Sequence, residues 1–169
     1  MWWLVSPQNP LKDVAGMAPL PARIAAARLA ARHPRIRVSA VEVALGTRYA
    51  VDTVAALQRR YPKTRFIWLI GADNLVQLHR WKDWRRLACR IPIAVLARPG
   101  YGHRLRTAPA MAWLRRGLHR ATDVRHWREW ELPAIVILDI QLSPLSATQV
   151  RARDPGWAAA VHVATETRS

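Results

Sequence analysis

Short apolar runs alternate with longer amphipathic stretches along the 169-residue chain. The short runs are rich in β-branched and aromatic residues, whereas the longer stretches repeat apolar residues at helical spacing. The predicted strands are residues 2–6, 36–43 (a strand with its extension), 66–71, 93–97 and 134–138. The predicted helices are residues 19–32, 49–61, a short one from about Asn74, 83–90, one near 110–118, and 146–153. Such alternation predicts an α/β domain with a parallel sheet.

Two stretches depart from this alternating pattern. Residues 66–71, FIWLIG, are continuously apolar, which is typical of a strand covered on both faces. Apart from its one helix, the segment 101–133 is expected to be irregular. Ligands of parallel α/β sheets bind where the strands end, so the connecting loops are the place to look for chemistry. These loops are residues 6–12, 71–73, 98–101 and 143–148.

Composition adds a net charge of +16, with Arg as 24 of the 27 basic residues. A basic surface attracts polyanions, but these Arg residues are scattered rather than gathered in one stripe, so charge alone does not decide the function. No apolar run approaches the roughly 20 residues that cross a bilayer, and no secretory signal is visible. We therefore expect a cytoplasmic protein. Its single cysteine, Cys89, cannot form an internal disulfide and is expected to be a core or boundary residue.

The segment LSATQVR, residues 145–151, combines the features of an anion site. Ser146 or Thr148 stands at the start of a predicted short helix, and Arg151 lies one turn further on. A hydroxyl, free backbone N–H groups and a nearby guanidinium suit a phosphate. Ordinary N-capping beside a surface Arg is the alternative interpretation, and the segment taken alone favours it.

Two further segments carry candidate ligand-binding residues. Gly71 ends a predicted strand, where backbone can approach a ligand closely, and Asp73 can cap a helix or hold a ribose hydroxyl pair. Trp81 offers a flat surface for ring stacking, unless it is a core aromatic. Tyr49, beside Asp52 at another helix start, has the same two interpretations. No phosphate-loop, GxGxxG, HExxH or CxxC pattern occurs, so no metal site is predicted.

Taken in order, five segments resemble the successive motifs of bacterial nicotinate-nucleotide adenylyltransferase, of the nucleotidylyltransferase superfamily. They are SPQNPLK, LGTRYAVDT, IGADNLVQLHRW, ARPGY and LSATQVR. The resemblance covers residues 2–153 and implies a Rossmann-like, doubly wound parallel sheet in one domain, residues 1–153, with a C-terminal tail, 154–169.

The resemblance also implies a reaction in NAD biosynthesis. AMP would pass from ATP, with Mg²⁺, to nicotinic acid mononucleotide, which gives deamido-NAD and pyrophosphate without a covalent enzyme intermediate. The implied ATP-binding residues are Ser146, Thr148, Arg151, Gly71 and Asp73. The implied residues for the nicotinate nucleotide are Tyr49, Trp81, Lys12 and Arg98.

The chain departs from that family pattern in two ways. Ala50 stands where the family commonly has Thr, so one substrate-contacting hydroxyl is absent. The family's opening strand and its GGSFDPxHxGH-type segment have no counterpart, and no histidine has an HxGH setting, so no catalytic residue is assigned. We therefore expect an N-terminally truncated fold with impaired catalysis, in which the strands at 2–6 and 66–71 each lack a neighbour on one edge.

Two other functions stay open at this point. The first is a non-catalytic basic module that binds nucleotides or nucleic acid, although no recognised nucleic-acid motif occurs. The second is a related adenylyltransferase, such as one that acts on pantetheine phosphate. The expected partners are ATP and nicotinic acid mononucleotide, not a membrane or nucleic acid, and a homo-oligomer stays open.

Overall fold

A computed structural model describes residues 1–7, 17–97 and 102–139. The chain divides into two compact units, whose described residues fall within Met1–Arg48 and Tyr49–Pro144. The predicted domain boundary at residue 153 lies outside the described residues. Each unit is a parallel α/β arrangement with a sheet of its own.

The first unit holds a two-stranded parallel sheet. Strand β1, Trp2–Leu4, pairs with β2, Arg37–Ser39, and helix α1, Leu20–Ala30, forms the crossover between them. Helix α1 follows Pro19 and carries a proline in its first turn, where the missing N–H has no intrahelical partner to lose. The predicted strand at 2–6 and helix at 19–32 are confirmed, with shorter bounds.

The predicted strand at 36–43 is wrong in its second half. After β2 ends at Ser39, the chain forms a short helix, α2, Val41–Leu45. Gly46 follows this helix with φ 62°, in the left-handed conformation, and its N–H bonds back to carbonyls of the helix. A glycine in this conformation is a common helix terminator, and the alternation of apolar residues hid it.

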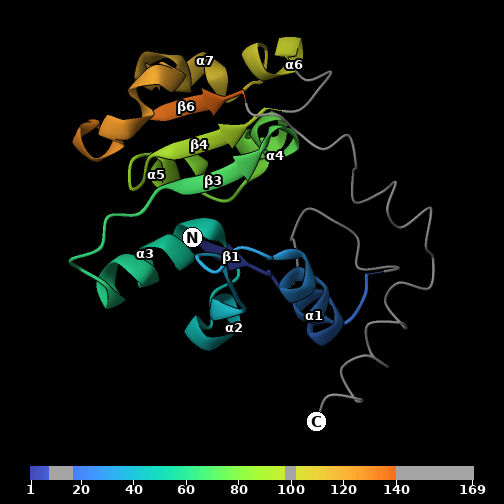
Figure 1. The fold of residues 1–169 in the computed structure, drawn as a ribbon. Helices are drawn as coiled ribbons and strands as arrows, with labels where there is room; N and C mark the ends of the chain where they lie inside the picture. The colour runs from blue at the N-terminus through green and yellow to red at the C-terminus, as the bar shows by residue number, and fades with distance from the viewer. Residues whose placement is uncertain (8–16, 98–101, 140–169) are drawn as a thin grey trace. The chain divides into compact units, whose positions relative to one another are not determined.

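The second unit holds a four-stranded parallel sheet in the order β3-β4-β6-β5. Figure 1 shows β3, β4 and β6 side by side. The strands are β3, Trp68–Gly71; β4, Ile93–Leu96; β5, Leu118–His119; and β6, Ile135–Leu138. The predicted α/β class with parallel strands is confirmed. Within the described residues the strands form two sheets, and β1 pairs only with β2 while β3 pairs only with β4.

Helices connect these strands, and residues 102–133, within the segment expected to be irregular, are more ordered than predicted. The predicted helices at 49–61, near 74 and at 83–90 are confirmed, while the one at 110–118 ends early, in a 3₁₀ turn and the added strand β5. The α-helices are α3, Ala50–Arg60; α4, Ala72–Gln77; α5, Trp84–Ala88; α6, Gly102–Arg106; and α7, Met111–Leu114. The 3₁₀ helices are η1, Leu78–Arg80; η2, Arg115–Gly117; and η3, Ala121–Glu129.

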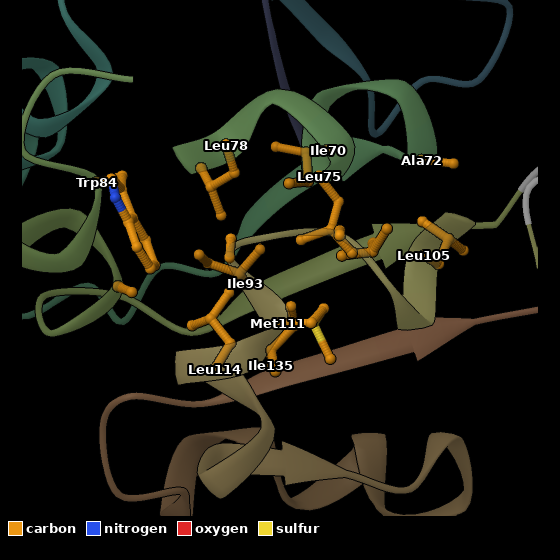
Figure 2. Close-up of a cluster of buried hydrophobic side chains, with 14 residues drawn as sticks. Ile70, Ala72, Leu75, Leu78, Trp84, Ile93, Leu105, Met111, Leu114 and Ile135 are labelled. Atoms are coloured by element: carbon orange, nitrogen blue, oxygen red, sulfur yellow. The ribbon is translucent and has the colours of Figure 1, made fainter. Parts of the chain in front are cut away.

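One apolar core joins the second unit's sheet to its helices. Figure 2 shows side chains from α4, α7 and the strands pointing toward one another. Leu75, Leu78, Ile93, Leu114 and Ile135 in this cluster are fully buried. A second cluster packs α3 against α5 through Val51, Val54, Leu87 and Ile91. These two clusters fix the helix starts that carry the candidate site.

Two predictions about burial are wrong. Leu69, in the run expected to be covered on both faces, is 41% exposed. Its neighbour Ile70 is buried because it points to the opposite face, onto the helices, whereas β3 forms an edge of the sheet in the described part of the chain. Cys89, expected in the core or at its boundary, is exposed just after α5 ends.

Candidate functional site

Tyr49 is held firmly at the start of α3. It is the N-cap residue, with extended backbone, and its carbonyl accepts hydrogen bonds from the N–H groups of Asp52 and Thr53, both at 3.0 Å. The hydroxyl of Thr53, a fully buried residue, donates to the same carbonyl at 3.1 Å. Three donors therefore fix this backbone position, and the half-buried Tyr49 side chain packs against the cluster between α3 and α5.

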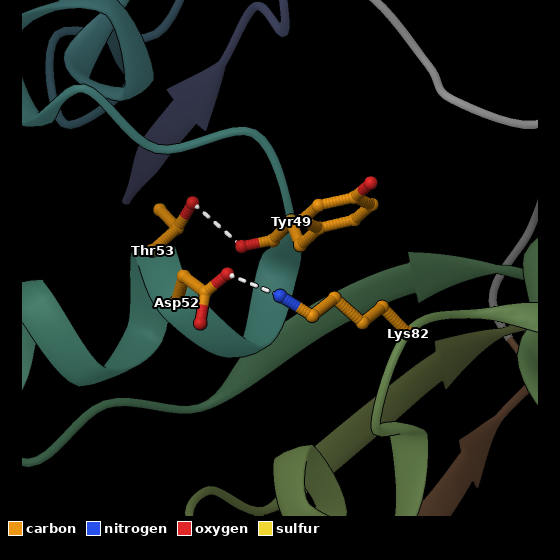
Figure 3. A network of polar contacts seen from close by, with 4 residues as sticks. All are labelled: Tyr49, Asp52, Thr53 and Lys82. Carbon is orange, nitrogen blue, oxygen red and sulfur yellow. Dashed lines mark hydrogen bonds and ion pairs between the residues drawn. The ribbon is translucent and has the colours of Figure 1, made fainter.

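Lys82 lies against Tyr49 and Asp52, as Figure 3 shows. Its Nζ is 3.4 Å from Oδ2 of Asp52 and 4.6 Å from the centre of the Tyr49 ring. Sequence reasoning missed Lys82, because the contact joins residues thirty positions apart and no local pattern reports it. The one available signal was its place directly after the candidate residue Trp81.

Trp81 lies at the end of η1, where its N–H donates to the carbonyl of Leu78 at 2.9 Å. Its indole is partly buried and packs against both apolar clusters. Trp81 and Tyr49 therefore flank the same cluster between α3 and α5. The Trp81 side chain packs on apolar residues on one side and is partly exposed to solvent on the other. This arrangement is compatible with both interpretations, a core residue or a surface for a ligand.

Gly71 and Asp73 lie where β3 passes directly into α4. Gly71 is both the last residue of β3 and the N-cap of α4, with φ −80° and ψ 163°, a conformation open to any residue. The cap interpretation of Asp73 is therefore wrong, because α4 starts at Ala72, two residues earlier than an Asp73 cap requires. Asp73 instead sits, partly buried, in the first turn, where the helix dipole favours a carboxylate. Its ribose-binding role stays a prediction.

The other predicted site residues lie outside the described residues. They are Lys12, Arg98, Ser146, Thr148 and Arg151. The described part of the site thus consists of Tyr49 and Trp81 on one cluster and of Gly71 and Asp73 at the β3–α4 junction, all within the second unit. Among described residues, no group of three or more His, Cys, Asp or Glu side chains could hold a metal ion.

Comparison with known proteins gives the family. Residues 1–153 match the family model described as cytidylyltransferase-like. The chain belongs to the cytidylyltransferase-like family. This family is built on a Rossmann-type α/β fold with parallel strands, which agrees with both units of the structure.

Individual relatives of this cytidylyltransferase-like chain are close in sequence. A probable nicotinate-nucleotide adenylyltransferase of Erythrobacter litoralis is 50% identical over 157 residues, which cover 93% of this chain and 72% of the relative. Proteins of the same name from Parvibaculum lavamentivorans and Cereibacter sphaeroides are 51% and 49% identical, over 93% and 90% of this chain and 78% and 80% of their own lengths.

These matches confirm the predicted resemblance and enzyme class. The cytidylyltransferase-like chain is a nucleotidyltransferase of the adenylyltransferase kind. In the described part of the structure, every helix is too short or too polar to pass through a lipid bilayer.

Proposed function

We propose that this chain transfers AMP from Mg²⁺-ATP to nicotinic acid mononucleotide, which produces deamido-NAD and pyrophosphate in the cytoplasm. The observation that carries the proposal is about 50% identity, over more than 90% of this chain, to proteins named as probable nicotinate-nucleotide adenylyltransferases. The position of Tyr49 and Trp81 beside one apolar cluster supports it, because a pyridine ring needs a flat, partly apolar surface.

Each site residue then has a proposed task. Tyr49 and Trp81 hold the pyridine ring, while Gly71 and Asp73 meet the nucleotide riboses at the β3–α4 junction. Hydroxyl-bearing and basic residues complete the site. Those proposed to contact ATP phosphates are Ser146, Thr148 and Arg151, and those proposed near other substrate phosphates are Lys12 and Arg98.

The proposed reaction is a direct displacement at phosphorus. An oxygen of the mononucleotide 5′-phosphate forms a bond to the α-phosphorus of ATP, and the bond between that phosphorus and the β-phosphate bridge oxygen breaks. Pyrophosphate leaves with the released electron pair, in company with Mg²⁺ as part of the substrate complex. No protein nucleophile is needed, so the residues act by orienting the two nucleotides and offsetting phosphate charge.

An assay of the purified chain tests this proposal. The chain is incubated with ATP, Mg²⁺ and nicotinic acid mononucleotide, and the amounts of deamido-NAD and pyrophosphate formed are measured. The two products should form in equal amounts. In parallel, binding of the mononucleotide is followed by titration calorimetry, so that a low rate is distinguished from a lack of recognition. We expect the mononucleotide to bind and both products to form.

Variants locate the ring site. Trp81→Ala is expected to weaken mononucleotide binding by about 10-fold or more, since one stacked aromatic contributes roughly 1–3 kcal/mol. Trp127→Ala, in η3, is the matched control and should bind normally. Absence of both binding and turnover with nicotinic acid mononucleotide, or better binding of pantetheine phosphate, would contradict the proposed function.

A further inference from the structure

Two tryptophans and two arginines from separate helices form a continuous row of contacts in the second unit. Trp84 of α5 and Trp113 of α7 pack edge to face, with ring centres 5.5 Å apart. The Arg85 guanidinium lies over the Trp84 ring, 4.7 Å from its centre. At the other end, the Arg116 guanidinium lies over the Trp113 ring, 3.9 Å from its centre. We call these four residues the Arg–Trp ladder.

The Arg–Trp ladder is anchored in the apolar core and exposed at its two ends. Trp84 is 9% exposed and belongs, with Leu114, to the cluster shown in Figure 2, and Trp113 packs against that cluster. Arg85 and Arg116 are exposed. An aromatic ring attracts a cation placed over its face, so each guanidinium has a preferred position while it stays accessible to a ligand.

The chain around the Arg–Trp ladder is strongly cationic. Arg86 and Arg115, the neighbours of the ladder arginines in sequence, are also exposed. From Trp84 to Thr122 the sequence contains no Asp or Glu. Among the described residues, no carboxylate forms an ion pair with any of these four arginines. The arginines are scattered along the sequence, but the contact between the two tryptophans brings both pairs to one region, where their positive charge has no direct partner.

The Arg–Trp ladder lies toward the end of the sheet where strands begin. Helix α5 leads into the start of β4, and η2, which contains Arg116, leads directly into the start of β5. Gly71 and Asp73 lie instead where β3 ends. Because all four strands are parallel, their starts share one end of the sheet and their last residues share the other. A ligand on the ladder would therefore leave the β3–α4 junction free for substrate.

We infer that the Arg–Trp ladder is a binding surface for single-stranded RNA. A guanidinium binds phosphate oxygens through two N–H groups at once, and its plane also stacks on unpaired bases. Because a tryptophan already restrains each guanidinium, less side-chain freedom is lost on binding. RNA presents unpaired bases in loops and at ends, whereas a duplex hides the faces of its bases from such a surface.

An anionic membrane fits this surface less well. Proteins that lie on a membrane insert apolar side chains beside their cations, and both ladder tryptophans pack into the core instead. The uncompensated arginines therefore favour a partner that offers phosphates and stacking bases without a hydrocarbon layer.

Fluorescence anisotropy of a labelled oligouridylate of about 16 nucleotides, titrated with the full chain over a range of salt concentrations, tests the inference. The wild type should bind at low salt and weaken as salt rises. Arg85→Gln/Arg116→Gln should weaken binding by about 10-fold at one low salt concentration. It should also reduce the slope of log affinity against log salt by about 1.4, since each single-strand phosphate contact contributes about 0.7.

Two further double variants sharpen the measurement. Arg85→Lys/Arg116→Lys keeps the charge but loses the planar group, so it should restore the salt slope and only part of the affinity. Arg59→Gln/Arg60→Gln is the matched control, because it removes the same charge from exposed arginines in the last turn of α3. Its affinity should change by less than about 2-fold. Mononucleotide binding should be unchanged in every variant, which also shows that each one is folded.

Several results would overturn the inference while leaving the proposed function intact. They are a lack of RNA binding by the wild type even at low salt, an equal loss in the Arg59/Arg60 control, and tighter binding of a duplex than of the single strand. Full affinity in the lysine variant would overturn the stacking contact. Vesicles of phosphatidylserine and phosphatidylcholine are the competing ligand. If the glutamine variant at Arg85 and Arg116 lost vesicle binding but kept RNA binding, the surface would belong to a membrane instead.

Discussion

The two sheets of this chain are built from the same kind of parallel strand but are held by different forces. In the four-stranded sheet, large side chains such as Ile93 and Ile135 are fully buried under helices. In the two-stranded sheet, Trp2 and Trp3 are 40% and 41% exposed. The buried apolar residues described in that first unit are Val5, Ala22 and Ala27. Among the residues that the structure describes, apolar burial thus dominates one sheet and contributes little to the other.

This difference bears on function, because every described candidate site residue belongs to the second unit. A binding site needs side chains held at defined positions by a packed support, and the clusters beneath Trp81 and Tyr49 supply it. The two-stranded sheet has fewer buried contacts and should open more readily. Four substitutions test this difference between the two sheets.

The largest effect is expected in the apolar core of the second unit. Leu75, on α4, is fully buried in the cluster that also holds Ile93. Leu75→Ala leaves a cavity among residues that cannot all collapse into it, and should lower the free energy of unfolding by about 2–5 kcal/mol. Urea denaturation followed by tryptophan fluorescence measures the loss. Amide exchange in β4 should accelerate in parallel.

Val5→Ala is the matched change beside the two-stranded sheet. Val5 is 8% exposed and its N–H donates to the carbonyl of Ser39 at 2.9 Å, just beyond the β1–β2 pairs. Removing two methyl-sized groups should cost about 1.5 kcal/mol, at roughly 0.8 kcal/mol each. If Val5→Ala lowered the free energy of unfolding as much as Leu75→Ala, apolar burial would stabilise the two sheets equally.

Sequence patterns predicted the main strands and helices of the second unit, but they missed short elements. The apolar run IAVLA at 93–97 predicted a buried strand, and β4 lies there. The pattern also predicted α3 correctly, which lies between its cap residues Tyr49 and Tyr61. The spacing of apolar residues gave wrong predictions where a local feature decided the structure. Gly46 closes α2 within a stretch that alternates like a strand. Strand β5 has only two residues, too few for any period to appear.

The site shows the same limit. Tyr49, Gly71, Asp73 and Trp81 stand at element ends, which a strand–helix alternation locates from sequence alone. Lys82 was not found, because its position depends on how α3 meets the segment after η1, and that is a long-range packing result. Exposure of Leu69 likewise depends on which strands are neighbours, not on its own hydrophobicity.

A medium effect is expected at Arg23, which holds the first unit through polar contacts. Its guanidinium donates to the carbonyls of Ser6, Pro7 and Ala18 at 2.6, 2.7 and 3.0 Å. Arg23→Met removes all three charge-assisted bonds and should cost about 1.5–3 kcal/mol. Exchange of the Val5 amide, next to the anchored residues, should accelerate.

Arg28 supplies the control, since it is an exposed residue in the last turn of the same helix. Arg28→Met should lose only the favourable interaction with the helix dipole, about 0.3–1 kcal/mol. Equal losses for the two variants would show that net charge, and not the three carbonyl contacts, explains the Arg23 effect.

The smallest effect is expected at Thr53, whose buried hydroxyl makes a hydrogen bond within the second unit. Thr53→Val keeps the shape but removes the hydroxyl that donates to the Tyr49 carbonyl. Because two backbone N–H groups still donate to that carbonyl, no acceptor is left unsatisfied, and the cost should be about 0.5–1.5 kcal/mol. Thr53→Ser retains the donor and should recover any loss of mononucleotide affinity, although its missing methyl leaves a small cavity. If Thr53→Val left that affinity unchanged, the two backbone donors alone would suffice to position Tyr49, and the hydroxyl would matter to the fold alone.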